Sequence, residues 1–203
     1  MNSQTQRTRI AGPAGSIECA IDEPADRARG VAIVCHPHPQ GGGTLDNKVA
    51  QTLARAFVQR GYRAVRFNFR GVGASEGSFD DGRGETDDTL AVIAAHRDSA
   101  LPLALAGFSF GAYVVAQAAQ RLPDDAKAAA LVLVGPSTQK QQMPTVPEGT
   151  LVIHGEADDV VPLAATLDWA RPQALPVVVI PGAGHFFHGQ LTLLKNLVVR
   201  HGS

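Results

Sequence analysis

The feature of this sequence that most limits its fold is the alternation of short apolar runs with longer amphipathic stretches. The apolar runs are rich in β-branched residues and nearly continuous, which is typical of strands buried on both faces of a parallel sheet. Strands are predicted over residues 30–35, 62–67, 103–106, 130–134, 150–153 and 176–180.

The stretches between these runs have the periodicity of helices. In residues 48–60, apolar side chains recur every three or four positions, and the pattern ends at Gly61. Further helices are predicted over residues 85–97, 110–121, 163–170 and 189–201. Repeated strand–helix alternation predicts an α/β fold, with a mostly parallel central sheet and helices on both of its faces.

The beginning of the chain departs from this alternation. Residues 1–8 are polar, and we expect them to form a flexible tail. Residues 10–21 alternate loosely between apolar and polar, which predicts one or two antiparallel strands at the edge of the sheet. Since the chain has 203 residues and domains average about 150, residues 9–203 are expected to form a single domain.

Composition excludes several classes of protein. The chain is 44% hydrophobic and 18% charged, which is too apolar for a disordered chain and too mixed for a membrane protein. A net charge of −1 provides no basic excess for nucleic acid. No apolar run approaches the ~18 residues that span a bilayer, and the polar start lacks the core of a signal peptide. We therefore expect a cytoplasmic protein with neither a nucleic-acid nor a membrane partner.

The pattern G-x-S-x-G occurs twice, at residues 73–77 and 107–111. In a nucleophile elbow this pattern puts a serine on a sharp turn between a strand and a helix. Ser109 lies between a predicted strand and a predicted helix, whereas Ser75 precedes a glycine-rich stretch that cannot form a helix. We predict that Ser109 is a nucleophile and that Ser75 is a loop serine. The alternative role for Ser109, a helix N-cap, would not require both flanking glycines.

A nucleophilic serine needs a base, and the base needs a carboxylate to orient it. Of the seven histidines, His185 lies in a glycine-rich loop just after the strand predicted at 176–180, and His188 is the reserve candidate. That loop belongs to the carboxyl edge of the sheet, where the serine is also expected.

The acid should follow the preceding strand of the same edge. Asp158 and Asp159 compete for this role, with Glu156 as a third possibility. Because adjacent loop residues point in different directions, only one of the two aspartates can reach the histidine. Either choice puts serine, acid and histidine in the chain order of the α/β-hydrolases.

An oxyanion hole would complete this chemistry with two N–H donors. The Phe110 N–H is one candidate, because the start of the predicted helix favours negative charge. The second should come from residues 36–43, where His38 is the first choice and Gln40 the second. A metal site at His36 and His38 is disfavoured since no third ligand follows at a usable spacing, and no cofactor is expected.

At these positions the chain resembles small, lidless serine α/β-hydrolases with an H-P-H-P-x-x-G-G loop, a group related to dienelactone-hydrolase-like enzymes and esterases. The matching segments are residues 36–44, 67–75, 107–111, 155–158 and 182–185. The G-x-x-D pattern of the family favours Asp158, and the family loop after the second predicted strand accounts for Ser75 as architecture. Asn68 is a departure, because many relatives carry aspartate there.

The resemblance implies a serine carboxylesterase that works through an acyl-enzyme. Lids in this family lie between the sixth and seventh strands, and residues 135–149 leave no room for one. We therefore expect an open, shallow site for short or water-soluble esters. Phe108, Phe186, Phe187 and Gln40 are candidate substrate-binding residues, although core packing is the alternative for the phenylalanines.

Other functions use the same machinery. Thioesterases, lactonases and peptidases share the triad, and the sequence does not separate them from an esterase. A protein that only binds ligands on a hydrolase scaffold is a further alternative. Reaction with a fluorophosphonate would distinguish the enzymes from such a binding protein.

Overall fold

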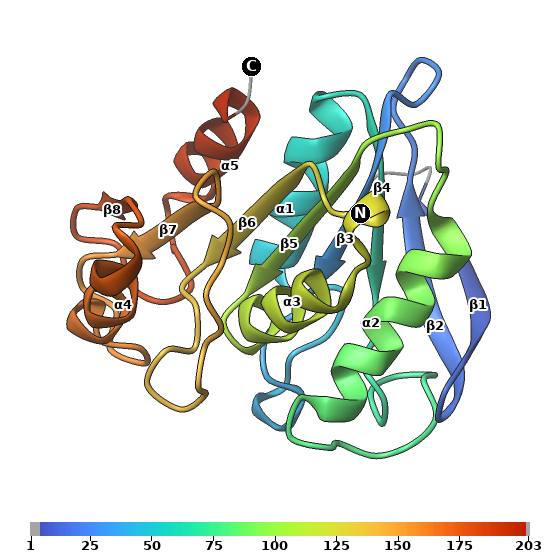
Figure 1. The fold of residues 1–203 in the computed structure, drawn as a ribbon, viewed down its shortest axis with the longest axis horizontal. Helices are drawn as coiled ribbons and strands as arrows, with labels where there is room; N and C mark the ends of the chain where they lie inside the picture. Colours follow the sequence, from blue (N-terminus) through green and yellow to red (C-terminus); the bar gives the residue numbers. More distant parts are fainter. Residues whose placement is uncertain (1–4, 202–203) are drawn as a thin grey trace.

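The computed structural model describes residues 5–201, which form a single eight-stranded sheet in the order β1-β2-β4-β3-β5-β6-β7-β8 (Figure 1). Strand β1 pairs antiparallel with β2, and β2 pairs antiparallel with β4, while the other neighbours are parallel. The strands are β1 (Gln6–Gly12), β2 (Gly15–Asp22), β3 (Gly30–Cys35), β4 (Tyr62–Phe67), β5 (Leu103–Phe108), β6 (Ala130–Val134), β7 (Leu151–Gly155) and β8 (Val177–Ile180). The predicted α/β-hydrolase architecture is confirmed.

Helices cover both faces of this sheet (Figure 1). They are α1 (Lys48–Gln59), α2 (Arg83–His96), α3 (Phe110–Arg121), α4 (Leu163–Ala170) and α5 (Leu191–Arg200), with short 3-10 turns η1 (Pro39–Gly41), η2 (Asp124–Ala126) and η3 (Arg171–Gln173). Helices α1 and α5 pack into the apolar core on one face, and α2, α3 and α4 contribute to the core on the other.

The two central strands show why their sequences are apolar throughout. All six residues of β3 and all six of β5 are buried. Each strand contacts helices on both faces, so neither set of alternating side chains meets water. Two strands end two residues later than predicted, since β5 continues to Phe108 and β7 to Gly155.

The expected N-terminal tail is wrong from Gln6 onward, where β1 begins, whereas residues 1–4 of that tail lie outside the described part of the chain. Gln6 pairs with Ile21 and Thr8 with Cys19 in the antiparallel ladder. Backbone hydrogen bonds hold an edge strand whatever its side chains, so polar residues there conceal a strand from a search for apolar runs.

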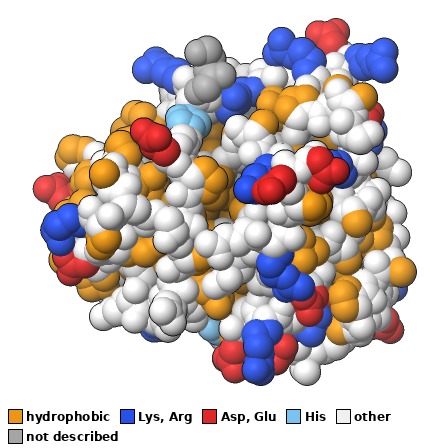
Figure 2. Space-filling model, in the orientation of Figure 1, with side chains coloured by type: hydrophobic (Ala, Val, Ile, Leu, Met, Phe, Trp, Pro, Cys, Tyr) orange, Lys and Arg blue, Asp and Glu red, His pale blue; other side chains and the backbone are white. Residues whose placement is uncertain are grey.

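The surface mixes both signs of charge. Over the face shown in Figure 2, basic and acidic side chains are interspersed with hydrophobic and neutral ones. Among residues 5–201, no helix combines the length and apolar character that crossing a membrane requires. Within residues 5–201, the exposed large hydrophobic side chains are Val160, Leu167, Val179, Phe186 and Leu193.

Candidate active site

Ser109 lies on the sharp turn between β5 and α3, with φ 56° and ψ −119°. A Cβ on Gly107 would lie 2.2 Å from the carbonyl oxygen of Gly111, and one on Gly111 would lie 2.4 Å from that of His36. Both contacts are too short for any side chain. The two glycines are therefore required for the turn, which holds the serine in a conformation that few L-residues adopt.

The structure brings Ser109, His185 and Asp158 together. His185 Nε2 lies 3.0 Å from Ser109 Oγ, and His185 Nδ1 lies 2.7 Å from Asp158 Oδ2. The three residues follow β5, β8 and β7, whose carboxyl ends share one edge of the sheet. All three side chains are buried or nearly so, at 7%, 3% and 7% exposure respectively. This arrangement allows a proton to pass from the hydroxyl to the imidazole.

The imidazole of His185 is held by rings on two sides. The Phe108 ring lies 4.8 Å from it between centroids, and the Phe186 ring lies 5.1 Å away, edge-on. Such contacts restrict ring rotation, so the hydrogen bonds to Ser109 and Asp158 keep their directions.

Asp158 is fixed by backbone donors as well as by His185. Its Oδ1 accepts hydrogen bonds from the N–H groups of Val160 and Val161, at 2.9 and 2.7 Å. Burial raises the pKa of this carboxyl, but the hydrogen bonds from His185 and from these N–H groups outweigh it, and the pKa lies below its ordinary value. Asp158 is therefore a carboxylate at neutral pH.

The competing acids point elsewhere. Asp159 is exposed. Glu156 accepts a hydrogen bond from the Gly182 N–H at 2.9 Å, which ties the loop after β7 to the loop after β8.

A second histidine lies beside the acid. His154 Nε2 is 2.9 Å from the Val161 carbonyl oxygen and 3.4 Å from Asp158 Oδ2, and the side chain is completely buried. Its Nδ1 has no hydrogen-bond partner among the described residues. Burial is the main reason that the pKa of His154 is lowered, so the ring is neutral and donates from Nε2. This contact between His154 and Asp158 was not predicted from the sequence.

The loop after β3 forms the opposite wall of the site. A Cβ on Gly43 would lie 2.1 Å from the Pro37 carbonyl oxygen, so the loop closes on itself only with glycine there. The N–H groups of Gly41, Gly42 and Gly43 bond to carbonyl oxygens of the same loop. Within residues 5–201, no protein acceptor takes the N–H of His38, Gln40 or Phe110, the three candidate oxyanion donors.

These elements enclose a cavity of about 460 Å³. It is lined by Pro37, His38, Gln40, Gly41, Gly42, Gly43, Asn47, Ser109, Phe110, Ser137, Lys140, Val160, Val161, His185 and Phe186. A second cavity, of about 410 Å³, lies near the starts of β6 and β7 and contains none of the predicted catalytic residues.

The predicted substrate-binding residues divide into two groups. Gln40 and Phe186 line the cavity, and Phe186 is 44% exposed. Phe108 and Phe187 are completely buried in the core between the sheet, α1 and α5, and neither lines the cavity. The prediction is wrong for these two because proximity in sequence does not fix the direction of a side chain.

The second G-x-S-x-G segment is part of the architecture. Ser75 Oγ donates to the Asn68 carbonyl oxygen at 2.7 Å and accepts from the Glu18 N–H at 2.9 Å. A Cβ on Gly73 would lie 2.4 Å from the Asn68 side-chain nitrogen. The serine and glycine therefore join the loop after β4 to strand β2.

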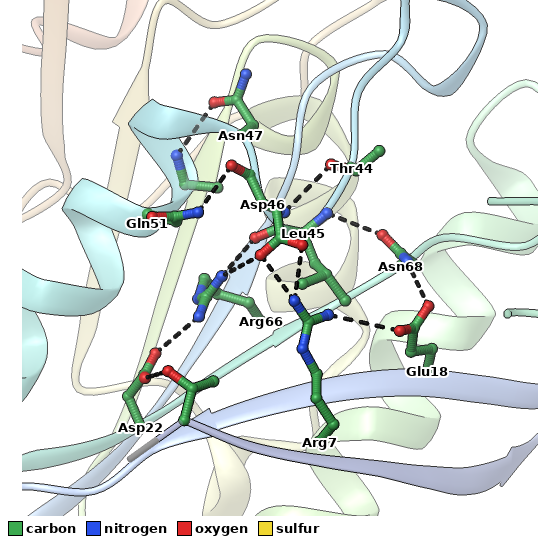
Figure 3. Close-up of polar contacts among 12 residues, drawn as sticks. Arg7, Glu18, Asp22, Thr44, Leu45, Asp46, Asn47, Gln51, Arg66 and Asn68 are labelled. Carbon is green, nitrogen blue, oxygen red and sulfur yellow. Dashed lines mark hydrogen bonds and ion pairs between the residues drawn. The ribbon is translucent and has the colours of Figure 1, made fainter. Parts of the chain in front are cut away.

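Asn47 lines the cavity, and a network of polar contacts holds the segment that leads to it (Figure 3). The Leu45 N–H donates to Asn68 Oδ1 at 2.8 Å, and the Leu45 carbonyl accepts from the Arg66 guanidinium at 2.7 Å. Arg66, which is 2% exposed, also pairs with Asp22 at 2.9 Å. The network fixes both polar groups of the Leu45 backbone and so positions this part of the wall. Asn68 stands out in the sequence as a departure from the family pattern, but this role is not predictable from it.

Arg66→Ala is expected to lower the free energy of unfolding by about 2–4 kcal/mol, because it leaves the Leu45 carbonyl and Asp22 without their buried partner. Arg63→Ala is the matched control on the same strand. Its ion pair with Glu23 is exposed and should contribute less than about 1 kcal/mol. Urea unfolding of the two variants measures the difference, and equal losses would contradict a structural role for the network.

His36 is a buried neutral group beneath the same wall. Its Nδ1 lies 2.6 Å from the Pro37 carbonyl oxygen, and its Nε2 accepts from the Phe69 N–H at 3.1 Å. Burial lowers the pKa of His36 from 6.5 to about 4. The unfolded chain therefore binds a proton between these two values that the folded protein does not bind.

This difference predicts a pH-dependent stability. The contribution of His36 to the free energy of unfolding should be complete above pH 6.5 and should decrease as the pH falls toward about 4. At pH 4.5 this loss should amount to roughly 2–3 kcal/mol. The His36→Gln variant keeps an acceptor for the Phe69 N–H but does not titrate. Its unfolding free energy, measured in urea at pH 7 and 4.5, should decrease less than that of the wild type; parallel decreases would refute the assignment.

Comparison with known proteins places this geometry in a family. A family model described as X-Pro dipeptidyl-peptidase (S15 family) matches residues 16–175, which include Ser109 and Asp158. An α/β serine hydrolase homologue from Coxiella burnetii is 40% identical, with a TM-score of 0.87 over 98% of this chain and 97% of that one. An α/β serine hydrolase without a lid from Xanthomonas campestris is 38% identical, with a TM-score of 0.88 over 98% and 93% of the two chains.

A curated relative has no assigned function. It is an uncharacterized protein of Rickettsia prowazekii, 38% identical over 116 residues, which are 56% of this chain and 49% of the relative. The chain thus matches about half the length of that protein.

The segment between β6 and β7, where a lid would be inserted, spans residues 135–150 and contains no helix. This agrees with the solved relative that lacks a lid. From its family match and its solved relatives, the chain belongs to the S15 family and to the α/β serine hydrolases without a lid.

Proposed function

We propose that this protein is a serine carboxylesterase acting on short or water-soluble esters. The observation that carries the proposal is the hydrogen-bonded series Ser109–His185–Asp158, which opens directly into the cavity beside the oxyanion candidates. A base at 3.0 Å activates a hydroxyl that is otherwise a weak nucleophile.

In the proposed mechanism, Ser109 Oγ attacks the ester carbonyl carbon while its proton moves to His185 Nε2. The ionised Asp158 stabilises the imidazolium that forms. When the tetrahedral intermediate breaks down, the C–O bond to the alcohol breaks, and His185 returns the proton to the departing oxygen. A water molecule then repeats the sequence on the acyl-enzyme, which releases the acid and restores Ser109.

The negative oxygen of each intermediate needs donors that are not already occupied. The Phe110 N–H, at the start of α3, is one, and the helix dipole favours negative charge there. His38 remains the first candidate for the second donor and Gln40 the alternative, because the three glycine N–H groups of the loop are engaged within it.

Peptide hydrolysis is the second candidate function, because the matched family model is described as an X-Pro dipeptidyl-peptidase. Removing dipeptides from a free N-terminus requires a site for a protonated amine, which is normally provided by carboxylates. None of the described residues that line the cavity is Asp or Glu. This charge distribution favours esters over N-terminal dipeptides.

Fluorophosphonate labelling combined with a substrate panel tests the proposal. We expect a single adduct on the peptide that contains Ser109, and faster hydrolysis of p-nitrophenyl esters than of an X-Pro p-nitroanilide. Within the esters, kcat/KM should be highest for acetate or butyrate, since no lid covers a long acyl chain. A maximum on long chains would refute the preference for short esters, and the absence of any adduct on folded protein would favour a binding function.

A further inference from the structure

The cavity beside Ser109 is electrostatically one-sided. Lys140 is the only Lys or Arg among the described residues that line it, and no Asp or Glu lines it. The remaining polar groups are neutral side chains, such as Gln40, Asn47 and Ser137, and the candidate base His185. The start of α3 adds a partial positive charge on the same side of the sheet. An anion entering this cavity therefore meets a cation, and none of the described residues that line the cavity carries a carboxylate.

The backbone that carries Lys140 is held in place. The Gln141 N–H donates to the Ser137 carbonyl at 3.1 Å, which closes the turn around Lys140. Thr138 Oγ1 lies 3.0 Å from Thr166 Oγ1, which is completely buried on α4. Met143, at 8% exposure, anchors the following residues in the core. The ammonium therefore extends from a fixed point on the rim.

Among the described residues, none neutralises this charge. Lys140 is exposed and forms no ion pair within residues 5–201. Its charge also acts across the cavity on His38. Burial lowers the pKa of His38, and Lys140 lowers it further against the opposing charges of Glu85 and Asp81.

A different part of the rim is apolar. Phe186 and Val160 line the cavity with 44% and 41% of their surfaces exposed. A ligand that matches both parts would have an apolar portion for these side chains and an anionic group for Lys140. Such a molecule is a carboxylate-bearing ester with an aryl or alkyl portion.

We propose that Lys140 is a specificity-determining residue that makes this enzyme prefer esters carrying a carboxylate in their acyl or alcohol part. The inference rests on the proposed esterase function and adds the substrate class to it. Lys140 takes no part in proton transfer, so its effect should fall on charged substrates alone.

Two substrate pairs test this on the full chain. Mono-p-nitrophenyl adipate carries the carboxylate on the acyl side, and 4-acetoxybenzoate carries it on the alcohol side; each is compared with its neutral methyl ester. The measured quantity is the kcat/KM of the charged ester divided by that of its neutral methyl ester. For at least one pair, Lys140→Gln should lower this ratio by about fivefold, and Lys140→Glu should lower it further. Lys195→Gln, which removes a charge outside the cavity, should leave both ratios unchanged.

Ionic strength gives an independent readout. Raising the salt concentration should reduce the wild-type preference toward that of Lys140→Gln, because an exposed charge is screened within about 8 Å at physiological salt. If the neutral esters are hydrolysed through Ser109 but both ratios are the same in wild type and Lys140→Gln, the substrate class is refuted and the esterase function stands. If wild type hydrolyses none of the four esters and forms no fluorophosphonate adduct, the esterase function and this inference both fail.

Discussion

Ser109→Ala is expected to lower kcat/KM for p-nitrophenyl acetate by at least about 10⁴-fold and to abolish fluorophosphonate labelling. The reason is that His185 Nε2 is bonded to this hydroxyl alone among the described residues. Alanine has no atom to attack with, and any remaining turnover would come from binding and the oxyanion donors. Because Ser109 makes no capping hydrogen bond to α3, the thermal midpoint should change little.

Ser75→Ala is the matched control, since both serines stand in the same sequence pattern. This variant deprives the partly buried Glu18 N–H and the buried Asn68 carbonyl of their partner, which should cost about 1–3 kcal/mol of stability. Its folded fraction should keep the wild-type kcat and the fluorophosphonate adduct. The reverse result, with Ser75→Ala inactive and Ser109→Ala active, would show that the nucleophile is assigned to the wrong elbow.

Asp158→Asn is expected to lower kcat by about 10³- to 10⁴-fold. The N–H groups of Val160 and Val161 already occupy Oδ1, so the asparagine oxygen should take that position and its NH₂ should face His185 Nδ1. The imidazole would then accept at Nδ1 and carry its proton on Nε2. In that tautomer it cannot take the proton of Ser109.

The adjacent aspartate provides the control. Asp159 is exposed and forms no ion pair within residues 5–201, so Asp159→Asn should keep kcat within about twofold. Steady-state kinetics on both variants separates the two candidates that the sequence left in competition. Equal activity of Asp158→Asn and wild type would remove Asp158 from the triad.

The protonation state of Asp158 adds a pH dependence with a definite sign. Its pKa in the folded protein lies below the ordinary value of an aspartate, so its stabilising contribution is complete above the unfolded pKa and is lost as the pH falls through the folded pKa. The stability difference between wild type and Asp158→Asn should therefore be constant near neutral pH. It should change only below about pH 4, as followed by urea unfolding.

The sheet was largely predictable because its determinants are local. A run such as residues 30–35 is apolar throughout only when both faces of the strand are covered, and all six residues are buried. The strand before Ser109 and the helix after it likewise separated the two serine patterns. Parallel strands end at a common edge, so the order of Ser109, Asp158 and His185 along the chain was enough to expect them near one another.

The directions of side chains in the loops were not predictable in the same way, because loops have no periodicity. Phe186 faces the cavity while Phe187 is buried in the core, and Asp158 reaches the histidine while Asp159 is exposed. In each pair, neighbouring residues of the same type have opposite environments. Packing against distant parts of the chain decides which one turns inward.

By itself, then, the sequence determined the layered fold, the sharp turn at Ser109 and the edge of the sheet where the chemistry is expected, since each follows from periodicity or from local steric need. Only the tertiary structure decided which residues share the cavity. It placed His154 against Asp158, Arg66 beneath Leu45 and Lys140 on a cavity that none of the described Asp or Glu residues lines. These contacts join segments far apart in the chain, and long-range packing rather than local pattern sets their geometry.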